Sequence, residues 1–168
     1  MSIAACQTSL TMMLLLAAST ASAQITNTTY RQRPGTVNEQ VVAFVQERMG
    51  KKVGRGECWD LAAEALNNAG ASWDGSYGWG VVLDPGVDSI LPGDVIQFKD
   101  VELEWEEGNS RNRMTMPHHT AVVMEVKAPG VFVIAHQNFG PIGRKVGTTE
   151  LVLAHVKKGR TTFYRPQG

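Results

Sequence analysis

The chain has 168 residues, 43% of them hydrophobic, and its sixteen basic residues are balanced by sixteen acidic ones. A net charge of zero gives no electrostatic reason to expect binding to nucleic acid or to an anionic membrane surface. The length suits one domain that buries a proper hydrophobic core, and we expect a monomer.

The N-terminal segment reads as an export signal. Residues 1–23 carry no charge, contain an apolar stretch from Leu10 to Ala18 and end in the small residues Ala21-Ser22-Ala23. Because the apolar stretch is too short to span a membrane, we predict a cleaved signal peptide and no integral membrane contact. The protein would then be exported, either periplasmic or secreted. Residues 24–35 are predicted to form a flexible leader, and residues 36–168 the domain.

Two helices are predicted at the start of this domain. Thr36 and Glu39 have the spacing of a capping box, and apolar residues on one helical face follow until Gly50. A second helix is predicted to begin around Glu57, and Gly70 is a natural C-terminal stop for it. The small alanines of the second helix indicate close packing against a sheet.

Helical periodicity disappears between Ala71 and Ile90, where Trp73, Tyr77 and Trp79 alternate with glycines. This pattern predicts a long surface loop, and such loops in small domains are often functional. Together with Trp59, these aromatic side chains are candidates for stacking on a sugar or peptide substrate. The alternative is that the rings of the loop cover the edge of the core.

The rest of the chain has the pattern of β-strands. Val101 to Trp105 alternates, and we expect it to pair with the segment near Met114. The residues 151–156 fit no single element. We predict an α+β fold in which two N-terminal helices pack on a small antiparallel sheet, with strands at 95–98, 101–105, 119–126, 131–136 and 161–164 and a polar hairpin loop over 106–113.

Cys58 is the strongest candidate for a catalytic residue. With Cys6 inside the predicted signal, Cys58 is the one cysteine that an exported protein would keep, and an unpaired thiol is then open to oxidation. At a helix N-terminus, free N–H groups and the helix dipole favour the thiolate and supply a donor for an oxyanion. We therefore predict a nucleophile. The alternative is a buried cysteine that serves only as a small hydrophobe.

Two histidines are predicted to complete the site. His119 begins one predicted strand and His136 ends the next, so a short turn between antiparallel strands brings them close together. His119 would act as general base and then acid, and His136 would orient it, with Asn138 as the second candidate for the orienting role. His118 would lie on the opposite face, in solvent, and a register slip of one residue would exchange the two.

These residues stand in motifs whose order resembles that of small papain-like hydrolases of the NlpC/P60 and CHAP type. The resemblance covers roughly residues 37–165 and implies a papain-like fold that cuts amide bonds, most often in peptidoglycan. NlpC/P60 members often have histidine at the position of His136, and CHAP domains have asparagine at that of Asn138. The motifs are Gly56-Glu57-Cys58-Trp59, Leu91-Pro92-Gly93-Asp94-Val95-Ile96-Gln97-Phe98 and His119-Thr120-Ala121-Val122-Val123.

The sequence also departs from these families. The Ser-Gly that follows the NlpC/P60 nucleophile is missing after Cys58, and neither family explains the loop 71–90. Tyr164-Arg165-Pro166 resembles the ending of the cysteine-proteinase-fold domain of fungal actin-patch proteins, a more distant similarity in which activity is not assured.

The favoured hypothesis is an exported thiol hydrolase without a cofactor that acts on peptidoglycan or a peptide. Its rival is a catalytically inactive module of the same fold that binds glycan or peptide. A zinc site built from Cys58 and the histidines has weak support, because the usual paired ligand motifs are missing.

Overall fold

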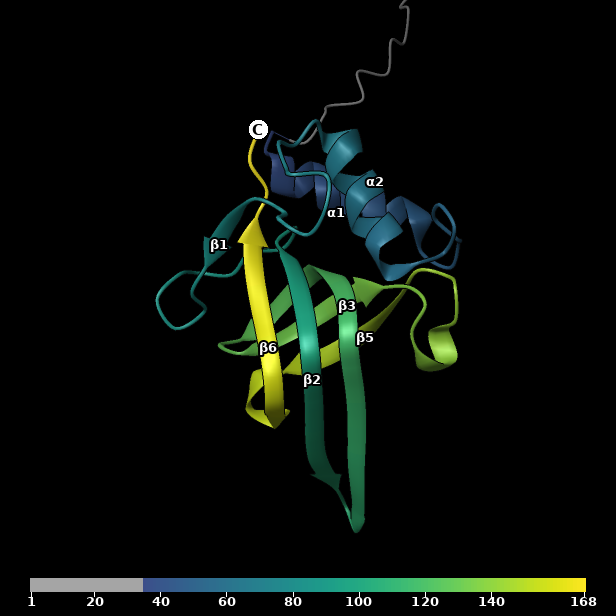
Figure 1. The fold of residues 1–168 in the computed structure, drawn as a ribbon, viewed down its shortest axis with the longest axis vertical. Coiled ribbons are helices and arrows are strands. Elements are labelled where there is room, and N and C mark those ends of the chain that lie inside the picture. Colours follow the sequence, from purple (N-terminus) through teal and green to yellow (C-terminus); the bar gives the residue numbers. More distant parts are fainter. Residues whose placement is uncertain (1–34) are drawn as a thin grey trace, which may run out of the picture. The chain divides into compact units, whose positions relative to one another are not determined.

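The computed structural model describes residues 35–168, and these lie in one compact unit. The predicted signal peptide and nearly all of the predicted leader lie outside the described residues. Two helices and a six-stranded antiparallel sheet, in the order β1-β6-β2-β3-β4-β5, confirm the predicted α+β fold (Figure 1). The elements are α1 Val37–Arg48, α2 Cys58–Ala69, β1 Val81–Leu83, β2 Val95–Glu107, β3 Ser110–Ala128, β4 Val131–His136, β5 Gly147–Val152 and β6 Val156–Arg165, with short 3₁₀ helices at Gly140–Ile142 and Leu153–His155.

The two predicted helices are confirmed, and their ends follow from local chemistry. At α1, the Thr36 side chain accepts the backbone N–H of Glu39, while the Glu39 carboxylate accepts that of Thr36. At α2, the Asp60 carboxylate accepts the backbone N–H of Glu57. Gly70 ends α2 with a φ of 67°, in the left-handed region that favours glycine. Within residues 35–168, no helix is long and apolar enough to cross a membrane.

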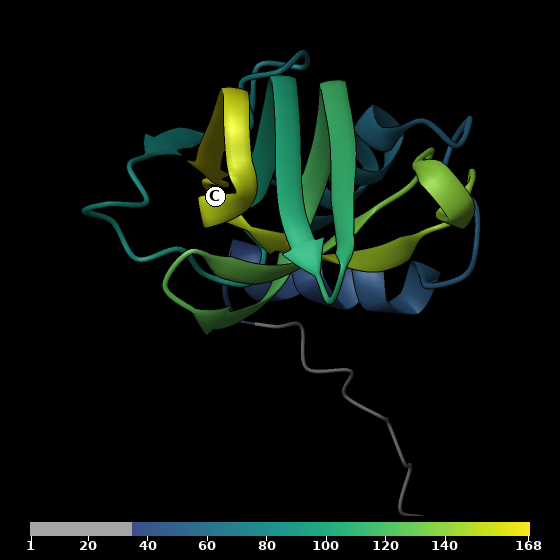
Figure 2. The same cartoon turned by 90° about the horizontal axis from the view of Figure 1, so that it is seen from below.

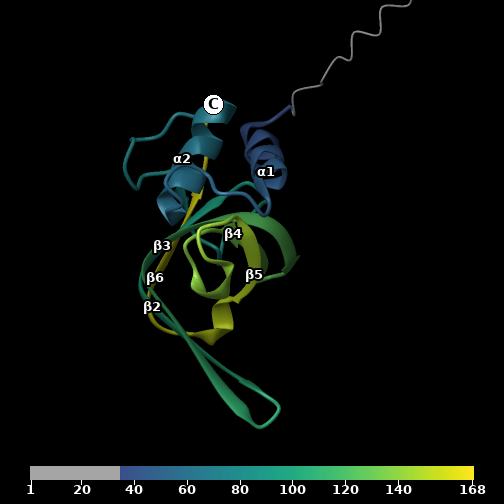
Figure 3. The ribbon, with the colours of Figure 1, turned by 90° about the vertical axis from the view of Figure 1, so that its right-hand side faces the viewer.

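The sheet is strongly curved (Figures 2 and 3). Apolar side chains are buried on both of its faces. One face packs against the helices, in a core that contains Leu61 and Leu66 of α2 together with Val95 and Val122 of the sheet. The concave face closes on itself around a second core that contains Phe98, Phe132, Ile134, Leu151 and Phe163. Two cores explain why strand residues on both sides of β2, β3 and β4 are apolar where the sheet curves.

The hairpin of β2 and β3 is longer than the sequence pattern predicts, and projects beyond the rest of the sheet (Figure 1). The prediction of a polar loop over 106–113 is wrong, because the two strands continue until Glu107 pairs with Ser110. Ion pairs between the strands, Arg111 with Glu104 and Arg113 with Glu102, lie on the exposed ladder. Polar side chains therefore stabilise strand pairing here rather than marking a loop.

Other elements also differ from the prediction. The strands expected at 95–98 and 101–105 form one strand, β2, and β5 is not among the predicted strands. Two further differences concern the segment 71–90 and the last strand. The residues 71–90 include the short strand β1, which pairs with β6, so this segment is not wholly a loop. The last strand begins at Val156 rather than at Thr161. Both differences arise where exposed residues pair along an edge, which weakens the alternation between apolar and polar residues.

A buried ion pair joins two of the sequence motifs. Asp94 is fully buried, and its carboxylate accepts hydrogen bonds from Arg165 Nε at 3.1 Å and Nη2 at 2.9 Å. Asn38 Nδ2 of α1 and the backbone N–H of Leu91 complete its surroundings, at 2.9 and 2.8 Å. Gly93 precedes it with a φ of 90°, and a Cβ there would lie 2.4 Å from the Asn38 carbonyl oxygen. The Pro-Gly-Asp turn thus anchors α1 to β6.

We expect Arg165→Met to lower the free energy of unfolding by about 2–4 kcal/mol, because it leaves the Asp94 carboxylate buried without its cation. Urea unfolding measures the change. Arg160→Met on the same strand is the matched control, since Arg160 is exposed, and it should stay within about 0.5 kcal/mol of the wild type. Equal losses in the two variants would contradict this assignment.

Candidate active site

Cys58 is the first residue of α2 and is half-buried. It lies in a cleft of about 480 Å³ between the start of α2 and the aromatic loop. The lining residues are Arg55, Glu57, Cys58, Trp59, Gly75, Ser76, Tyr77 and His118. The predicted helix start therefore carries the thiol to an open surface hollow, where a substrate has access to it.

The thiol is held in its neutral form. Burial raises the pKa of Cys58 above its usual range, against the smaller lowering by the backbone N–H groups of Thr120 and Trp59, which hydrogen-bond the sulfur. The sequence-based expectation that the helix start favours the thiolate is thus outweighed by desolvation. Thr120 directly follows His119 on β3, so its contact with the sulfur places Cys58 beside the strand that carries His119.

The two predicted histidines meet in the interior. His119 Nε2 lies 2.8 Å from His136 Nδ1, and both rings are buried. Phe139 packs against both rings, with centroids 5.1 Å from His119 and 4.5 Å from His136. The other nitrogen of His136, Nε2, lies 3.2 Å from the hydroxyl of Thr149 on β5. The turn between β3 and β4 thus brings together the residues that the sequence pattern pairs, and leaves His119 Nδ1 for a reaction partner.

Both imidazoles are neutral at neutral pH. Burial lowers the pKa of His119 to about 4, helped by the nearby His118. Burial also lowers the pKa of His136 to about 3, helped by His119. A neutral imidazole can accept a proton from a neutral thiol, whereas a resting thiolate–imidazolium pair is disfavoured by these surroundings.

Asn138 has a different position from the one expected of an orienting residue. Its amide donates to Glu57 Oε2 at 2.6 Å, and Arg144 pairs with the other oxygen of Glu57 at 3.0 Å. The residue adopts a φ of 56°, which turns the chain away from β4 after His136. His136 is therefore the residue that contacts His119, and Asn138 holds the residue that precedes the cysteine.

Gln137 is a positioning residue that the sequence reasoning missed. It is fully buried, accepts the Val53 backbone N–H at 3.1 Å, and donates to the carbonyls of Val53 at 2.9 Å and Glu57 at 2.7 Å. Its amide thereby fixes both ends of the loop that leads into Cys58. A polar residue directly after a buried strand end is a signal for such a clamp, but the sequence does not say what it holds.

Gln97 on β2 was also missed, and it fixes the strand of His119. Its Nε2 donates to the His119 carbonyl at 2.9 Å, and its Oε1 accepts the hydroxyl of Thr120 at 2.9 Å. The indole N–H of Trp79 donates to the same Oε1 at 3.3 Å. The amide thus satisfies three polar groups in a buried layer under the site.

The four aromatic residues predicted to bind substrate divide between core and cleft. Trp79 is fully buried and stacks on Trp73 with ring centroids 5.0 Å apart, so Trp79 belongs to the core and not to a substrate surface. Trp73 packs against the same core and donates its indole N–H to Asn67. Trp59 and Tyr77 line the cleft beside Cys58.

His118 is exposed, as predicted, and it also lines the cleft. Its ring meets Tyr77 edge-on at 4.5 Å between centroids, across the opening from the helix. The register places His119 opposite Phe98 on the concave side, so the two neighbouring histidines have separate surroundings.

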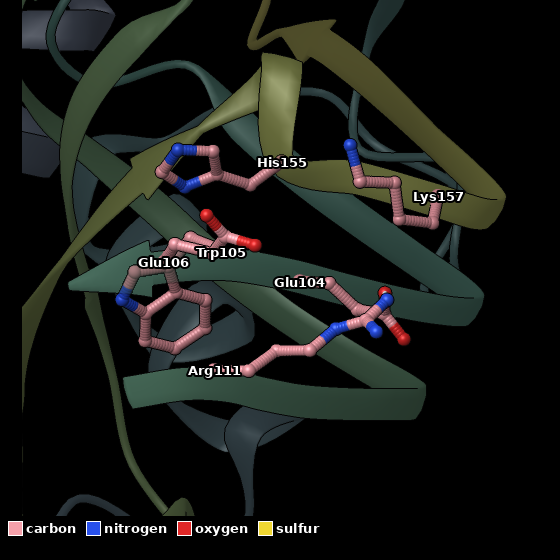
Figure 4. A pocket seen from close by; sticks show the side chains of 6 residues that line it. All are labelled: Glu104, Trp105, Glu106, Arg111, His155 and Lys157. Carbon is pink, nitrogen blue, oxygen red and sulfur yellow. The ribbon is translucent and has the colours of Figure 1, made fainter. Parts of the chain in front are cut away.

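A second hollow lies by the long hairpin (Figure 4). Trp105 stacks on His155 at 6.0 Å, and an ion pair between Arg111 and Glu104 forms part of the lining. His155 thus packs against a residue of the long hairpin. This hollow has no cysteine in its lining. In the described part of the chain, no group of three or more histidine, cysteine, aspartate or glutamate residues is arranged to hold a metal ion.

Comparisons with known proteins agree with this architecture. The family described as "AIM3/BBC1 Cysteine proteinase-fold domain" matches residues 18–168. Altered inheritance of mitochondria protein 3 from Debaryomyces hansenii is 30% identical over 146 residues, which cover 76% of this chain and 16% of that protein. The match is therefore to a small part of a much longer relative. The predicted signal peptide receives no support from these comparisons.

A solved structure shares the fold. The crystal structure of Ly7917 with the hydrolyzing product of MDP has a TM-score of 0.51 and 20% sequence identity, and the likeness covers 78% of this chain and 63% of that one. Together with the match to a cysteine proteinase-fold family, this likeness confirms the predicted papain-like architecture.

The buried histidine pair should make stability depend on pH. Histidine titrates near pH 6.5 in an unfolded chain, whereas the pKa values of His119 and His136 are lowered to about 4 and about 3. Below pH 6.5 the unfolded state binds more protons, so the free energy of unfolding should fall with pH, by up to about 1.4 kcal/mol per pH unit for each histidine. Urea unfolding between pH 7 and 4 measures the slope.

His136→Phe, which keeps a buried ring without a titrating group, should reduce this slope by roughly the share of one histidine. His155→Gln removes a histidine outside the pair and should retain the wild-type slope. If the free energy of unfolding of His136→Phe changes with pH in parallel with that of the wild type, the histidine pair is not the source of the pH dependence.

Proposed function

The chain belongs to the AIM3/BBC1 cysteine proteinase-fold domain family, and from this premise we propose that it is a thiol hydrolase that cleaves an amide bond. The observation that carries the proposal is the hydrogen bond between His119 and His136, at 2.8 Å, beside the strand residue whose N–H contacts the Cys58 sulfur. Cys58 is the nucleophile, His119 the general base, and His136 orients His119.

The reaction begins from a neutral site. As Sγ of Cys58 attacks the carbonyl carbon, its proton passes to Nδ1 of His119, and the backbone N–H of Cys58 at the helix start stabilises the oxyanion. The His119 imidazolium then gives this proton to the leaving nitrogen while the C–N bond breaks. Water hydrolyses the resulting thioester, with His119 taking a proton from the water and returning it to the sulfur.

The substrate class is a peptide. The cleft is open to solvent and offers Trp59 and Tyr77 as apolar contacts beside Cys58, which suits the side chains of a peptide. Ly7917 was solved with the hydrolyzing product of MDP. Because the sequence motifs resemble those of hydrolases that act on peptidoglycan, peptidoglycan fragments are a second class to test. Export through residues 1–23, action as a monomer, and the lack of nucleic-acid partners remain part of this proposal.

A second candidate is a catalytically inactive module that binds glycan or peptide in the same cleft. The observation that favours it is the partly buried thiol with its raised pKa, since such a thiol attacks slowly unless a base takes its proton. The two candidates differ in whether Cys58 is needed for a chemical change in the ligand.

To separate them, the protein is incubated with a synthetic peptide library and with a digest of peptidoglycan, and the products are identified by mass spectrometry. The wild type should release fragments, and Cys58→Ala should release none. His119→Gln should lower the rate by about 10²–10⁴-fold, the range for loss of a general base. His155→Gln, at the second hollow, is the control and should keep the wild-type rate.

Binding of the same substrates to Cys58→Ala, measured by calorimetry, completes the design. Retained binding with fragments formed only by the wild type supports the hydrolase. A wild type that binds substrates without cleaving them would contradict the hydrolase and leave the binding module. Equal fragment yields from the wild type and Cys58→Ala would exclude Cys58 as the nucleophile.

A further inference from the structure

The hydrogen-bonded chain does not end at His136. Thr149 lies on β5, an edge strand that pairs with β4 in the register Ile134 to Thr149. Its hydroxyl lies 3.2 Å from Nε2 of His136, the nitrogen that faces away from His119. Three strands thus contribute one polar group each to a continuous row.

This row can carry its protons in two directions. In the first, His119 Nε2–H donates to His136 Nδ1, and His136 Nε2–H donates to the Thr149 oxygen. In the second, the Thr149 hydroxyl donates to His136 Nε2, and His136 Nδ1–H donates to His119 Nε2. A neutral imidazole carries one N–H, so each direction fixes which nitrogen of His119 is bare.

Only the first direction leaves His119 able to act as a base. There Nδ1 of His119 is without a proton and can receive one from the thiol. In the second direction Nδ1 carries the proton, and both it and the neutral thiol are donors. The chemistry at Cys58 therefore depends on the group at the far end of the row.

We propose that Thr149 is a positioning residue that accepts the His136 Nε2–H and thereby holds His119 in the tautomer that accepts the thiol proton. Its role in turnover rests on the proposed function, whereas its effect on the tautomer does not. Thr149 is half-buried, and because its hydroxyl rotates about the C–O bond and has two lone pairs, its oxygen can accept the His136 N–H. Phe139 covers the ring of His136, which leaves the edge nitrogens as the polar contacts.

The test measures the tautomers directly. Nitrogen chemical shifts of ¹⁵N-histidine-labelled protein at pH 7 report which nitrogen of each ring carries the proton. In the wild type, His119 and His136 should both be protonated at Nε2. Thr149→Val keeps the shape but removes the acceptor, and the population should move toward protonation at Nδ1. Thr149→Ser keeps the hydroxyl and should restore the wild-type pattern.

The neighbouring Thr148→Val is the matched control, since Thr148 is exposed and pairs with Ala135. If the hydrolase is active, Thr149→Val should lower kcat about tenfold with little change in KM, and Thr149→Ser should recover most of it. Wild-type histidines protonated at Nδ1, or a Thr149→Val spectrum identical to the wild type, would overturn the proposal. The tautomers are measured even in a protein that cleaves nothing, so failure of the proposed function is recognised separately.

Discussion

The site depends on two imidazole rings that share one hydrogen bond inside a curved sheet. Because His119 and His136 are buried, protonation of either ring is costly, and both pKa values lie well below 6.5. Desolvation acts in the opposite direction on the pKa of Cys58, so thiol and base are both neutral at rest. The proposed chemistry thus needs proton transfer during attack and not a preformed ion pair.

The end of β4 connects the pair of His119 and His136 to the nucleophile. Three consecutive residues serve three purposes: His136 contacts the base, Gln137 clamps the loop before Cys58, and Asn138 holds Glu57. A shift of β4 along its neighbours would therefore disturb the base and the nucleophile together. The pair of Asp94 and Arg165 fixes α1 against β6.

Much of the arrangement could be predicted from local sequence signals. The capping box at Thr36, the glycine stop at Gly70 and the cysteine at a helix start depend on neighbours in the chain, so spacing reveals them. The approach of His119 to His136 was also predictable, because a short turn between antiparallel strands limits where they meet.

The features that could not be predicted from the sequence depend on burial in the tertiary structure. Trp79 and Trp73 stand in a glycine-rich segment of similar composition, yet Trp79 is fully buried, which no local pattern shows. Gln97 and Gln137 satisfy buried groups far away in the sequence, and an isolated glutamine gives no hint of its partners. The raised pKa of the thiol likewise follows from how much water the fold removes, which a helix-start argument does not contain.

The most direct test of this account is the thiolate absorbance near 240 nm. It is followed against pH for the wild type, and the absorbance of Cys58→Ala at each pH is subtracted. The account predicts no Cys58 signal between pH 5 and 8 and a rise only above about pH 8.5, the ordinary range of a thiol. A signal that appears below pH 7 would reveal a resting thiolate paired with an imidazolium and would contradict the neutral site.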